Sequence, residues 1–188
     1  MDTLIAWDRE LFLVLNGWGT PPFDGFWLLL SHALTNVVVY LLAWFYLSRK
    51  LKLRAALFLF LSTLLLILIT DQFTNLAKYF FSRLRPCHDP DLQAWVRLVK
   101  AGCGGQFGFF SGHASNSFAL AVFFGRFYRP LSRWMAFFFL ALATFIAYSR
   151  IYLGVHFPLD ILVGALVGSG FGKGAHYLFT KFISLQYR

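Results

Sequence analysis

The sequence is poor in charged residues, and particularly in acidic ones. Only 13% of its 188 residues are charged and 8 are Asp or Glu, whereas 59% belong to the hydrophobic set. Soluble domains are closer to half apolar and a quarter charged. The scarcity of charge excludes a disordered chain, because disorder requires low hydrophobicity and high net charge. It also excludes a soluble globule, which would lack polar side chains to cover its surface, so the composition indicates an integral membrane protein.

The few acids are outnumbered by 17 Lys and Arg, which gives a formal net charge of +9. In a soluble protein this excess would suggest nucleic-acid binding. In an apolar chain it is typical of the Lys and Arg enrichment of cytoplasmic loops. Because the basic residues are divided between two faces of the membrane, we expect no nucleic-acid partner.

The sequence also lacks internal repeats, low-complexity tracts and domain linkers, which predicts one all-α membrane domain over residues 1–188. A helix needs about 20 mostly apolar residues to cross the hydrocarbon layer. We expect about five spans: Phe26–Leu47, Ala55–Phe81, Ser111–Phe127, Trp134–Tyr152 and Pro158–Phe179.

Residues 1–20 contain too many acidic and basic side chains for a span, but they have an apolar stripe at helical spacing. A short helix with a Trp-bearing apolar face is typical of one that lies in the membrane interface. The stripe consists of Leu4, Trp7, Leu11, Val14 and Trp18.

Two of the expected inter-span loops contain basic residues and no acid, and the positive-inside rule places them in the cytoplasm. Residues 82–110 and the short loop near 153–157 are then extracytoplasmic, on the periplasmic side of an inner membrane. The C-terminal segment, with Lys181 and Arg188, faces the cytoplasm. The acid-free loops contain Arg49, Lys50, Lys52 and Arg54, and Arg126, Arg129 and Arg133.

Polar and ionisable residues gather where spans reach the extracytoplasmic face. Such residues are costly in a membrane and are functional candidates by default. Lys78 and Arg85 are seven positions apart, so they share a helix face up to Pro86. A Lys ammonium supplies a compact positive charge and an Arg guanidinium can donate two parallel hydrogen bonds, and both properties suit a phosphate group. The alternative is two cations that reach toward the interface.

Ser111-Gly112-His113 precedes an apolar helix. The Ser can cap that helix, and the free amides of its first turn form an anion site. The alternative is a plain N-cap with an uninvolved His.

His156 and Asp160 are four positions apart. Arg150 lies six positions before His156, across a turn that contains Gly154. Asp160 can hold one ring nitrogen of His156 and leave the other as nucleophile or base. Alternatively, Asp160 only complements the N-terminus of the helix that starts near Pro158. Two His, one Asp and three cations favour phosphoryl chemistry, while the two carboxylates of a glycosidase are absent.

These residues form three patterns: Lys78-x6-Arg85-Pro86, Ser111-Gly112-His113 and Ser149-Arg150-x5-His156-x3-Asp160. Their order and spacing resemble the type 2 phosphatidic acid phosphatase family, which shares its phosphate site with the vanadium haloperoxidases. The family's second pattern usually begins with Pro, where this chain has Phe110, a difference that bears on the shape of the turn rather than on the chemistry.

The resemblance implies that His156 takes the phosphoryl group, that Asp160 orients it, and that His113 protonates the leaving lipid oxygen. It implies a membrane-embedded helical bundle that needs no metal and no cofactor. A metal centre built from the two His is the alternative. By the same resemblance, the phosphate oxygens are held by Lys78, Arg85, Ser111, the Gly112 amide and Arg150.

Asp71 falls on one helix face with Asn75 and Lys78. A carboxylate at this depth is usually paired. We interpret Asp71 as structural, with a contribution to the site as the alternative.

The sequence has two cysteines, Cys87 and Cys103, and both lie in the loop at 82–110. On an oxidising face they can form a disulfide. Two free thiols are the alternative, and a zinc site with His88 lacks a clear fourth ligand.

The expected function is a lipid phosphatase of the outer leaflet, with undecaprenyl diphosphate as the first candidate substrate. Phosphatidylglycerol phosphate, phosphatidic acid and lipid A phosphate are further candidates. A phosphotransferase that uses a second lipid as acceptor is an alternative with the same site, and a non-enzymatic lipid-binding or transport protein is another.

Overall fold

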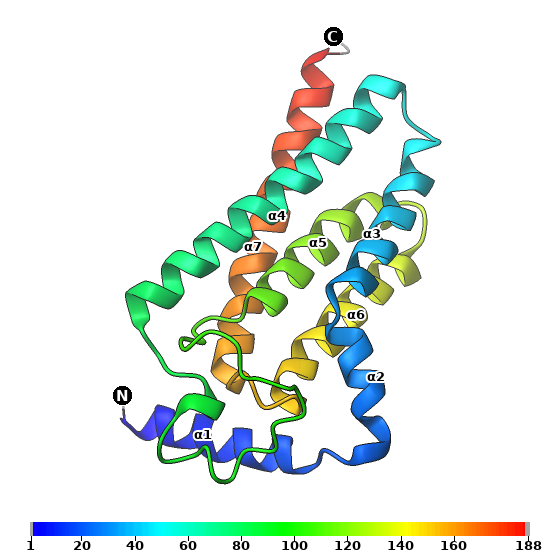
Figure 1. Cartoon of the computed structure of the whole chain (residues 1–188). Coiled ribbons are helices and arrows are strands. Elements are labelled where there is room, and N and C mark those ends of the chain that lie inside the picture. Colours follow the sequence, from blue (N-terminus) through cyan, green and yellow to red (C-terminus); the bar gives the residue numbers. More distant parts are fainter. Residues whose placement is uncertain (1, 187–188) are drawn as a thin grey trace.

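The structure is a computed structural model that describes residues 2–186, and it confirms the all-α class (Figure 1). Within these residues the β-type pairing is limited to one isolated bridge between Leu84 and Phe107. Arg188 lies outside the described residues. The helices are α1 (Asp2–Gly17), α2 (Pro21–Ser31), α3 (Ala33–Ser48), α4 (Leu53–Phe81), the 3-10 helix η1 (Pro86–His88), α5 (Gly112–Tyr128), α6 (Arg133–Tyr152) and α7 (Pro158–Gln186).

Helices α3 to α7 form a bundle, and α1 lies across one end of it (Figure 1). The long loop between α4 and α5 covers the same end, where α4 and α6 finish and α5 and α7 begin. Helix α5 is central, because it packs against α3, α4, α6 and α7. Its Phe123 and Phe124 are fully buried in the main apolar cluster, together with Phe139 of α6.

Two helices, α4 and α6, are each long and apolar enough to cross a membrane. The expected span 26–47 is divided into α2 and α3, which bend by 52° and together are long enough for a third. The break is at His32, whose backbone is extended and whose Nδ1 accepts a hydrogen bond from Leu34 N, which caps α3. The expected spans 111–127 and 158–179 are helical as α5 and α7, but neither is both long and apolar enough on its own.

Helices α5 and α7 approach so closely that glycines are required on one face of α7. A Cβ atom at Gly168 would lie 2.0 Å from the Ser115 carbonyl oxygen, and one at Gly172 would lie 2.3 Å from that of Ala119. Glycine at every fourth position lets helix backbones meet in membranes. This contact fixes the start of α7 against the start of α5.

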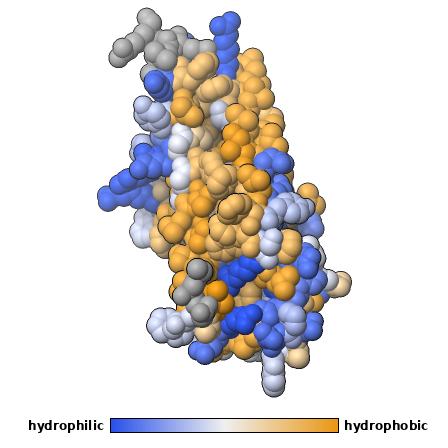
Figure 2. Space-filling view, turned by 90° about the vertical axis from the view of Figure 1, so that its left-hand side faces the viewer, coloured by the Kyte–Doolittle hydropathy of each residue, from blue (hydrophilic) through white to orange (hydrophobic). Residues whose placement is uncertain are grey.

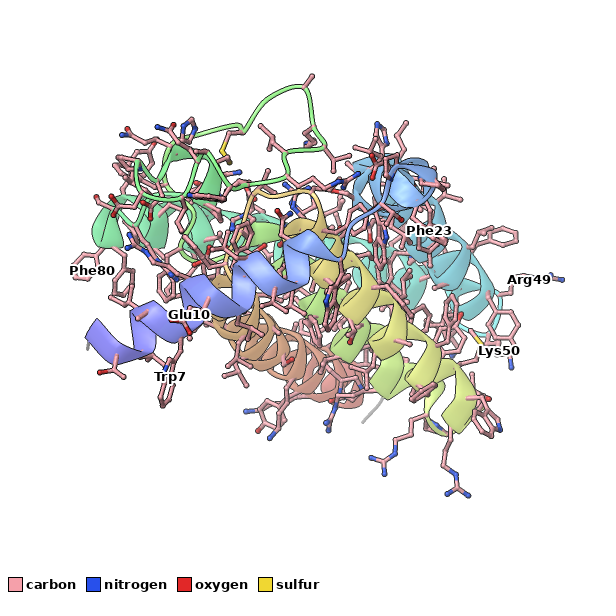
Figure 3. All side chains as sticks on the ribbon, turned by 90° about the horizontal axis from the view of Figure 1, so that it is seen from below. Trp7, Glu10, Phe23, Arg49, Lys50 and Phe80 are labelled. Carbon is pink, nitrogen blue, oxygen red and sulfur yellow. A yellow bond between two sulfur atoms is a disulfide. The ribbon has the colours of Figure 1, made fainter. Side chains whose placement is uncertain are left out.

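The N-terminal helix has the two faces that its sequence pattern predicts. The apolar stripe is exposed, with Trp7 65% and Leu11 48% accessible, and Figure 3 shows Trp7 pointing away from the rest of the protein. The opposite face is buried: Phe12 packs edge-on against Phe157 at 5.4 Å, and Asn16 Nδ2 donates to backbone carbonyls at the end of α6. Helix α1 is therefore anchored to the bundle by one face only.

The surface has an apolar body and a polar end. Figure 2 shows a broad apolar area along the bundle. Hydrophilic residues gather at the lower end, where α1 and the α4–α5 loop lie, and others lie along one edge and at the upper end. Many large apolar side chains of α4 are exposed, including Leu61, Leu65 and Leu76. A lipid environment covers such a surface without the cost that water would impose.

Candidate active site

The predicted site residues converge at the polar end of the bundle, although they come from six separate segments. Helix α4 and the loop after it contribute the first pair of cations, and the start of α5 contributes the Ser-Gly-His sequence. The end of α6, the α6–α7 turn and the start of α7 contribute the rest. In chain order these residues are Lys78, Arg85, Ser111, Gly112, His113, Arg150, His156 and Asp160.

His156 and Asp160 form a buried pair. His156 Nδ1 lies 3.2 Å from Asp160 Oδ2, and the two residues are 2% and 0% exposed. The same Oδ2 accepts the backbone N–H of Phe157 at 3.0 Å. Asp160 thus contacts the imidazole and also complements the start of α7, so the two interpretations of Asp160 coexist. Nε2 is the ring nitrogen that does not face the carboxylate.

The loop between α4 and α5 comes close to this pair at Gly108. A Cβ atom there would lie 3.2 Å from Asp160 Oδ2, 3.5 Å from His156 Nδ1 and 3.1 Å from Arg85 Cγ. Two of these separations are tighter than ordinary contacts, so a side chain at Gly108 would crowd Asp160 and Arg85. Gly108 therefore brings Arg85 to the His–Asp pair.

The Arg85 guanidinium is fixed by loop carbonyls. Its Nε donates to Phe107 O at 3.2 Å and one terminal nitrogen donates to Cys103 O at 3.0 Å. Cys103 is joined to Cys87 by a disulfide, with the two Cα atoms 6.0 Å apart. The covalent link holds the segment that supplies one of these carbonyls.

Lys78 is oriented by a polar chain along α4. Its Nζ donates to Asn75 Oδ1 at 3.3 Å, and Asn75 Nδ2 donates to Asp71 Oδ2 at 3.2 Å. The Nζ atom also lies 3.9 Å from the position that a Cβ at Gly112 would take, so Lys78 faces the first turn of α5. Asp71 is connected to Lys78 through Asn75, and its negative charge also acts on the Lys78 ammonium directly. The carboxylate is thus paired, and both interpretations of Asp71 stay open.

Arg150 is held by Ser31, at the break between α2 and α3. An Arg150 terminal nitrogen donates to Ser31 Oγ, and the His113 ring lies near the Ser31 backbone. Arg150 Nε is buried and has no protein partner among the described residues. Ser111, fully buried, caps α5 by accepting the Ala114 N–H at 3.4 Å. The division of the expected first span thus has a structural role in the site.

Electrostatics favour a neutral imidazole at His156. Burial lowers its pKa well below the usual value, and the positive charges of Arg85, Arg150 and Lys78 lower it further. Burial also lowers the pKa of Arg85, although an Arg stays charged because its usual pKa is so high. A neutral histidine beside three cations has a free lone pair in a field that attracts anions.

Two further charged residues, Arg83 and Asp8, contact the site and were not predicted from the sequence. Arg83 donates one arm to Asp160 Oδ1 at 2.9 Å and the other to Asp8 Oδ2 at 2.5 Å. Arg83 lies in the loop at 82–110 and belongs to none of the three sequence patterns. Asp8, on the N-terminal helix α1, belonged to no recognisable pattern.

An apolar cavity of about 300 Å³ leads from His113 into the bundle between α3, α4, α5 and α6. Its wall includes Val37, Trp44, Leu64 and Leu120. His113 therefore lies between the polar end of the protein and a space suited to a hydrocarbon chain.

The helical bundle with its apolar surface defines an integral membrane protein. A buried His–Asp pair, three cations and a capped helix N-terminus meet at its polar end. The chain belongs to the PAP2 superfamily, whose family model matches residues 55–184.

Relatives and solved structures support this assignment. The chain is 36% identical, over all of its length and 78% of the relative's, to a lipid A 4'-phosphatase of Porphyromonas gingivalis. It is 34% identical to a lipid A 4'-phosphatase of Bacteroides thetaiotaomicron, over 90% of this chain and 75% of the relative. The crystal structure of Aquifex aeolicus LpxE matches with a TM-score of 0.66 and 28% identity, over 88% of this chain and 92% of that one.

The fold also matches a PAP2-type phosphatidylglycerolphosphate phosphatase from Bacillus subtilis with a TM-score of 0.74. That match covers 98% of this chain and 88% of the other, at 17% identity. At this identity the likeness concerns the fold alone, and it agrees with a multi-pass membrane protein.

Proposed function

We propose that this protein is a membrane lipid phosphatase that cleaves a lipid phosphate through a phosphohistidine. The observation that carries the proposal is the buried His156–Asp160 pair, whose second ring nitrogen faces away from the carboxylate in a setting of three cations. Binding alone needs cations and amides but no oriented imidazole. The two lipid A 4'-phosphatase relatives support an enzyme of this class.

In the proposed first step, His156 Nε2 attacks the phosphorus and the bond from phosphorus to the lipid oxygen breaks. His113 gives its proton to that leaving oxygen. In the second step, water attacks the phosphohistidine while His113 takes a proton from it, which releases phosphate and restores both histidines. Asp160 holds His156 Nδ1 and stabilises the positive ring during the transfer.

The charge that develops on the phosphate oxygens is met by Lys78, Arg85 and Arg150. The Ser111 hydroxyl and the Gly112 N–H, at the N-terminus of α5, complete the anion site. Three fixed cations supply the charge that Mg²⁺ supplies in many other phosphoryl-transfer sites. We therefore expect activity without added metal.

The lipid part of the substrate fits the apolar cavity beside His113, since the leaving oxygen must lie at that residue. Lipid A phosphate becomes the leading candidate because two relatives bear that activity in their names. Undecaprenyl diphosphate, phosphatidylglycerol phosphate and phosphatidic acid follow. We place the site on the periplasmic face of the inner membrane, because the acid-free basic turns before α4 and α6 lie at the opposite end of the bundle (Figure 1).

The test is phosphate release from a panel of these lipids by purified protein in detergent with a chelator present. We expect release with at least one lipid, and none from His156→Ala. His176→Ala is the matched control, because His176 lies in the second half of α7, far from the site. Full activity in His156→Ala, or loss of activity with chelator, would refute the mechanism.

The same assay separates hydrolysis from transfer to a second lipid. With substrate labelled at the phosphate, we expect the label to appear as inorganic phosphate. Label that appears in a second lipid would identify a phosphotransferase instead.

A further inference from the structure

The carboxylate of Asp160 is held on both of its oxygens. Oδ2 faces His156 Nδ1 at 3.2 Å and accepts the Phe157 N–H at 3.0 Å. Oδ1 accepts one arm of Arg83 at 2.9 Å. The direction of the carboxylate, and with it the direction of the imidazole, therefore depends on where Arg83 is held.

Arg83 is in turn held by α1. Its other arm donates to Asp8 Oδ2 at 2.5 Å, and Asp8 Oδ1 accepts the Leu159 N–H at 2.8 Å. The guanidinium also lies over the Phe157 ring, 4.3 Å from its centroid. Asp8 thus fixes both the arginine and the first turn of α7, which contains Asp160.

These charges are removed from water, so their geometry matters. Asp8 is 6% exposed and the Asp160 side chain is fully buried, with one guanidinium shared between them. A buried carboxylate that loses its partner must move, bind a proton or admit water. Each of these changes would reach His156 through Asp160.

We propose, on the basis of the function proposed above, that Asp8 and Arg83 are positioning residues that hold Asp160 and His156 in the reactive arrangement. The N-terminal helix is then part of the catalytic apparatus. Its role is to present Asp8 to the bundle from the face opposite its exposed apolar stripe.

The test compares Asp8→Asn with Glu10→Gln, which makes the same change of charge on an exposed position of the same helix (Figure 3). We expect Asp8→Asn to lower kcat by about 10- to 100-fold with little change in KM, and Glu10→Gln to change neither. Arg83→Lys keeps the charge but has one nitrogen where Arg83 uses two to reach Asp160 and Asp8. It should therefore lower kcat in the same way while the protein stays folded. Equal kcat in the wild type, Asp8→Asn and Arg83→Lys would overturn the proposal.

A readout independent of turnover separates this proposal from the proposed function. In protein with 15N-labelled histidines, assigned by single substitution of the five, the His156 ring signals should shift in Asp8→Asn and not in Glu10→Gln. This result would support the positioning role even if no lipid were hydrolysed. Unchanged His156 signals in folded Asp8→Asn would refute it.

A second, independent feature lies at the other end of α5. A cavity of about 370 Å³ between α5 and α6 is lined by three arginines and no acid: Arg126, Arg129 and Arg133. Helix α5 has 17 residues, so this end is about 25 Å from the Ser-Gly-His turn. The cavity is therefore separate from the site described above.

The remaining wall is apolar. Small residues of both helices, Ala121, Gly125 and Ala136, meet there, and Val122, Phe137 and Leu140 complete the lining. Helix α6 begins beside the arginines, and its N-cap Ser132 makes no side-chain capping bond. Backbone N–H groups at an uncapped helix start favour an anion. The positive-inside rule explains basic residues in this loop, but it does not require the three arginines to line one apolar cavity.

We infer that this cavity binds an anionic phospholipid of the leaflet opposite the candidate active site, with the phosphate on the arginines and an acyl chain on the apolar wall. Basic pockets between membrane helices suit such headgroups. Arg126, whose Nε contacts His176 Nδ1 at 3.3 Å, is already oriented.

The test is retention of phosphatidylglycerol against phosphatidylcholine by detergent-purified protein, measured by native mass spectrometry. The triple variant Arg126→Gln, Arg129→Gln and Arg133→Gln should weaken phosphatidylglycerol binding by at least about 10-fold. The matched control neutralises three basic residues of the other acid-free loop, Arg49, Lys50 and Arg54. Equal losses in both triple variants, or glycerol phosphate binding as tightly as the whole lipid, would refute the site.

Discussion

The close contact between α5 and α7 gives a prediction whose size follows from geometry. A Cβ atom at Gly168 would lie 2.0 Å from the Ser115 carbonyl oxygen. Ordinary contacts begin near 3.4 Å, so Gly168→Ala requires the helices to separate locally by roughly 1.4 Å. The atom that is hit belongs to a helix backbone and cannot rotate away.

Overpacking of this kind costs about 1–3 kcal/mol, and a backbone collision belongs at the upper end of that range. For a chain of this length, a loss of about 3 kcal/mol corresponds to a fall of about 6–12 °C in Tm. Helix α5 presents His113 and α7 presents Asp160, so the separation also displaces the two halves of the site. A displacement near 1 Å can cost about 100-fold in rate.

The matched control is Gly170→Ala. No atom lies within 4 Å of a Cβ at Gly170, and Ala favours a helix over Gly by about 0.5–1 kcal/mol. Tm and kcat of the two variants, in the same detergent and with the same lipid phosphate, decide the matter. If Gly168→Ala and Gly170→Ala have the same Tm and the same kcat, α5 and α7 do not approach closely at Gly168.

Three further predictions concern the site. Replacement of Cys87 and Cys103 by Ser should lower stability by about 3 kcal/mol, by the entropy of a loop of this length, and a Tm equal to that of the oxidised wild type would contradict this. The depressed pKa of His156 keeps its imidazole neutral as the pH falls through 6.5. The acid limb of the kcat/KM profile should therefore lie below pH 6.5, after correction for the ionisation of the substrate, which 31P NMR measures. An acid limb of the enzyme at or above pH 6.5 would contradict the lowering of the His156 pKa by burial. Ser31→Ala leaves buried Arg150 without this partner and should lower kcat/KM about 10-fold, whereas unchanged kinetics would show that the contact does not position the guanidinium.

The site was predictable from the sequence where it depends on local pattern. Lys78, Arg85, Ser111, His113, His156 and Asp160 stand at the ends of apolar segments, and alternation of spans brings those ends to one side. The His–Asp spacing of four positions is set by helix geometry. These features need no knowledge of which helix packs against which.

Hydropathy alone determined that this is a helical membrane protein, because burial in lipid imposes long apolar helices on the chain. Only the tertiary structure decided that the first expected span breaks at His32, that Gly108 passes beside the His–Asp pair, and that Arg83 joins Asp8 to Asp160. Arg83 is 75 positions from Asp8 and 77 from Asp160. Contacts at such separations depend on how the helices pack, and no spacing in the sequence encodes them.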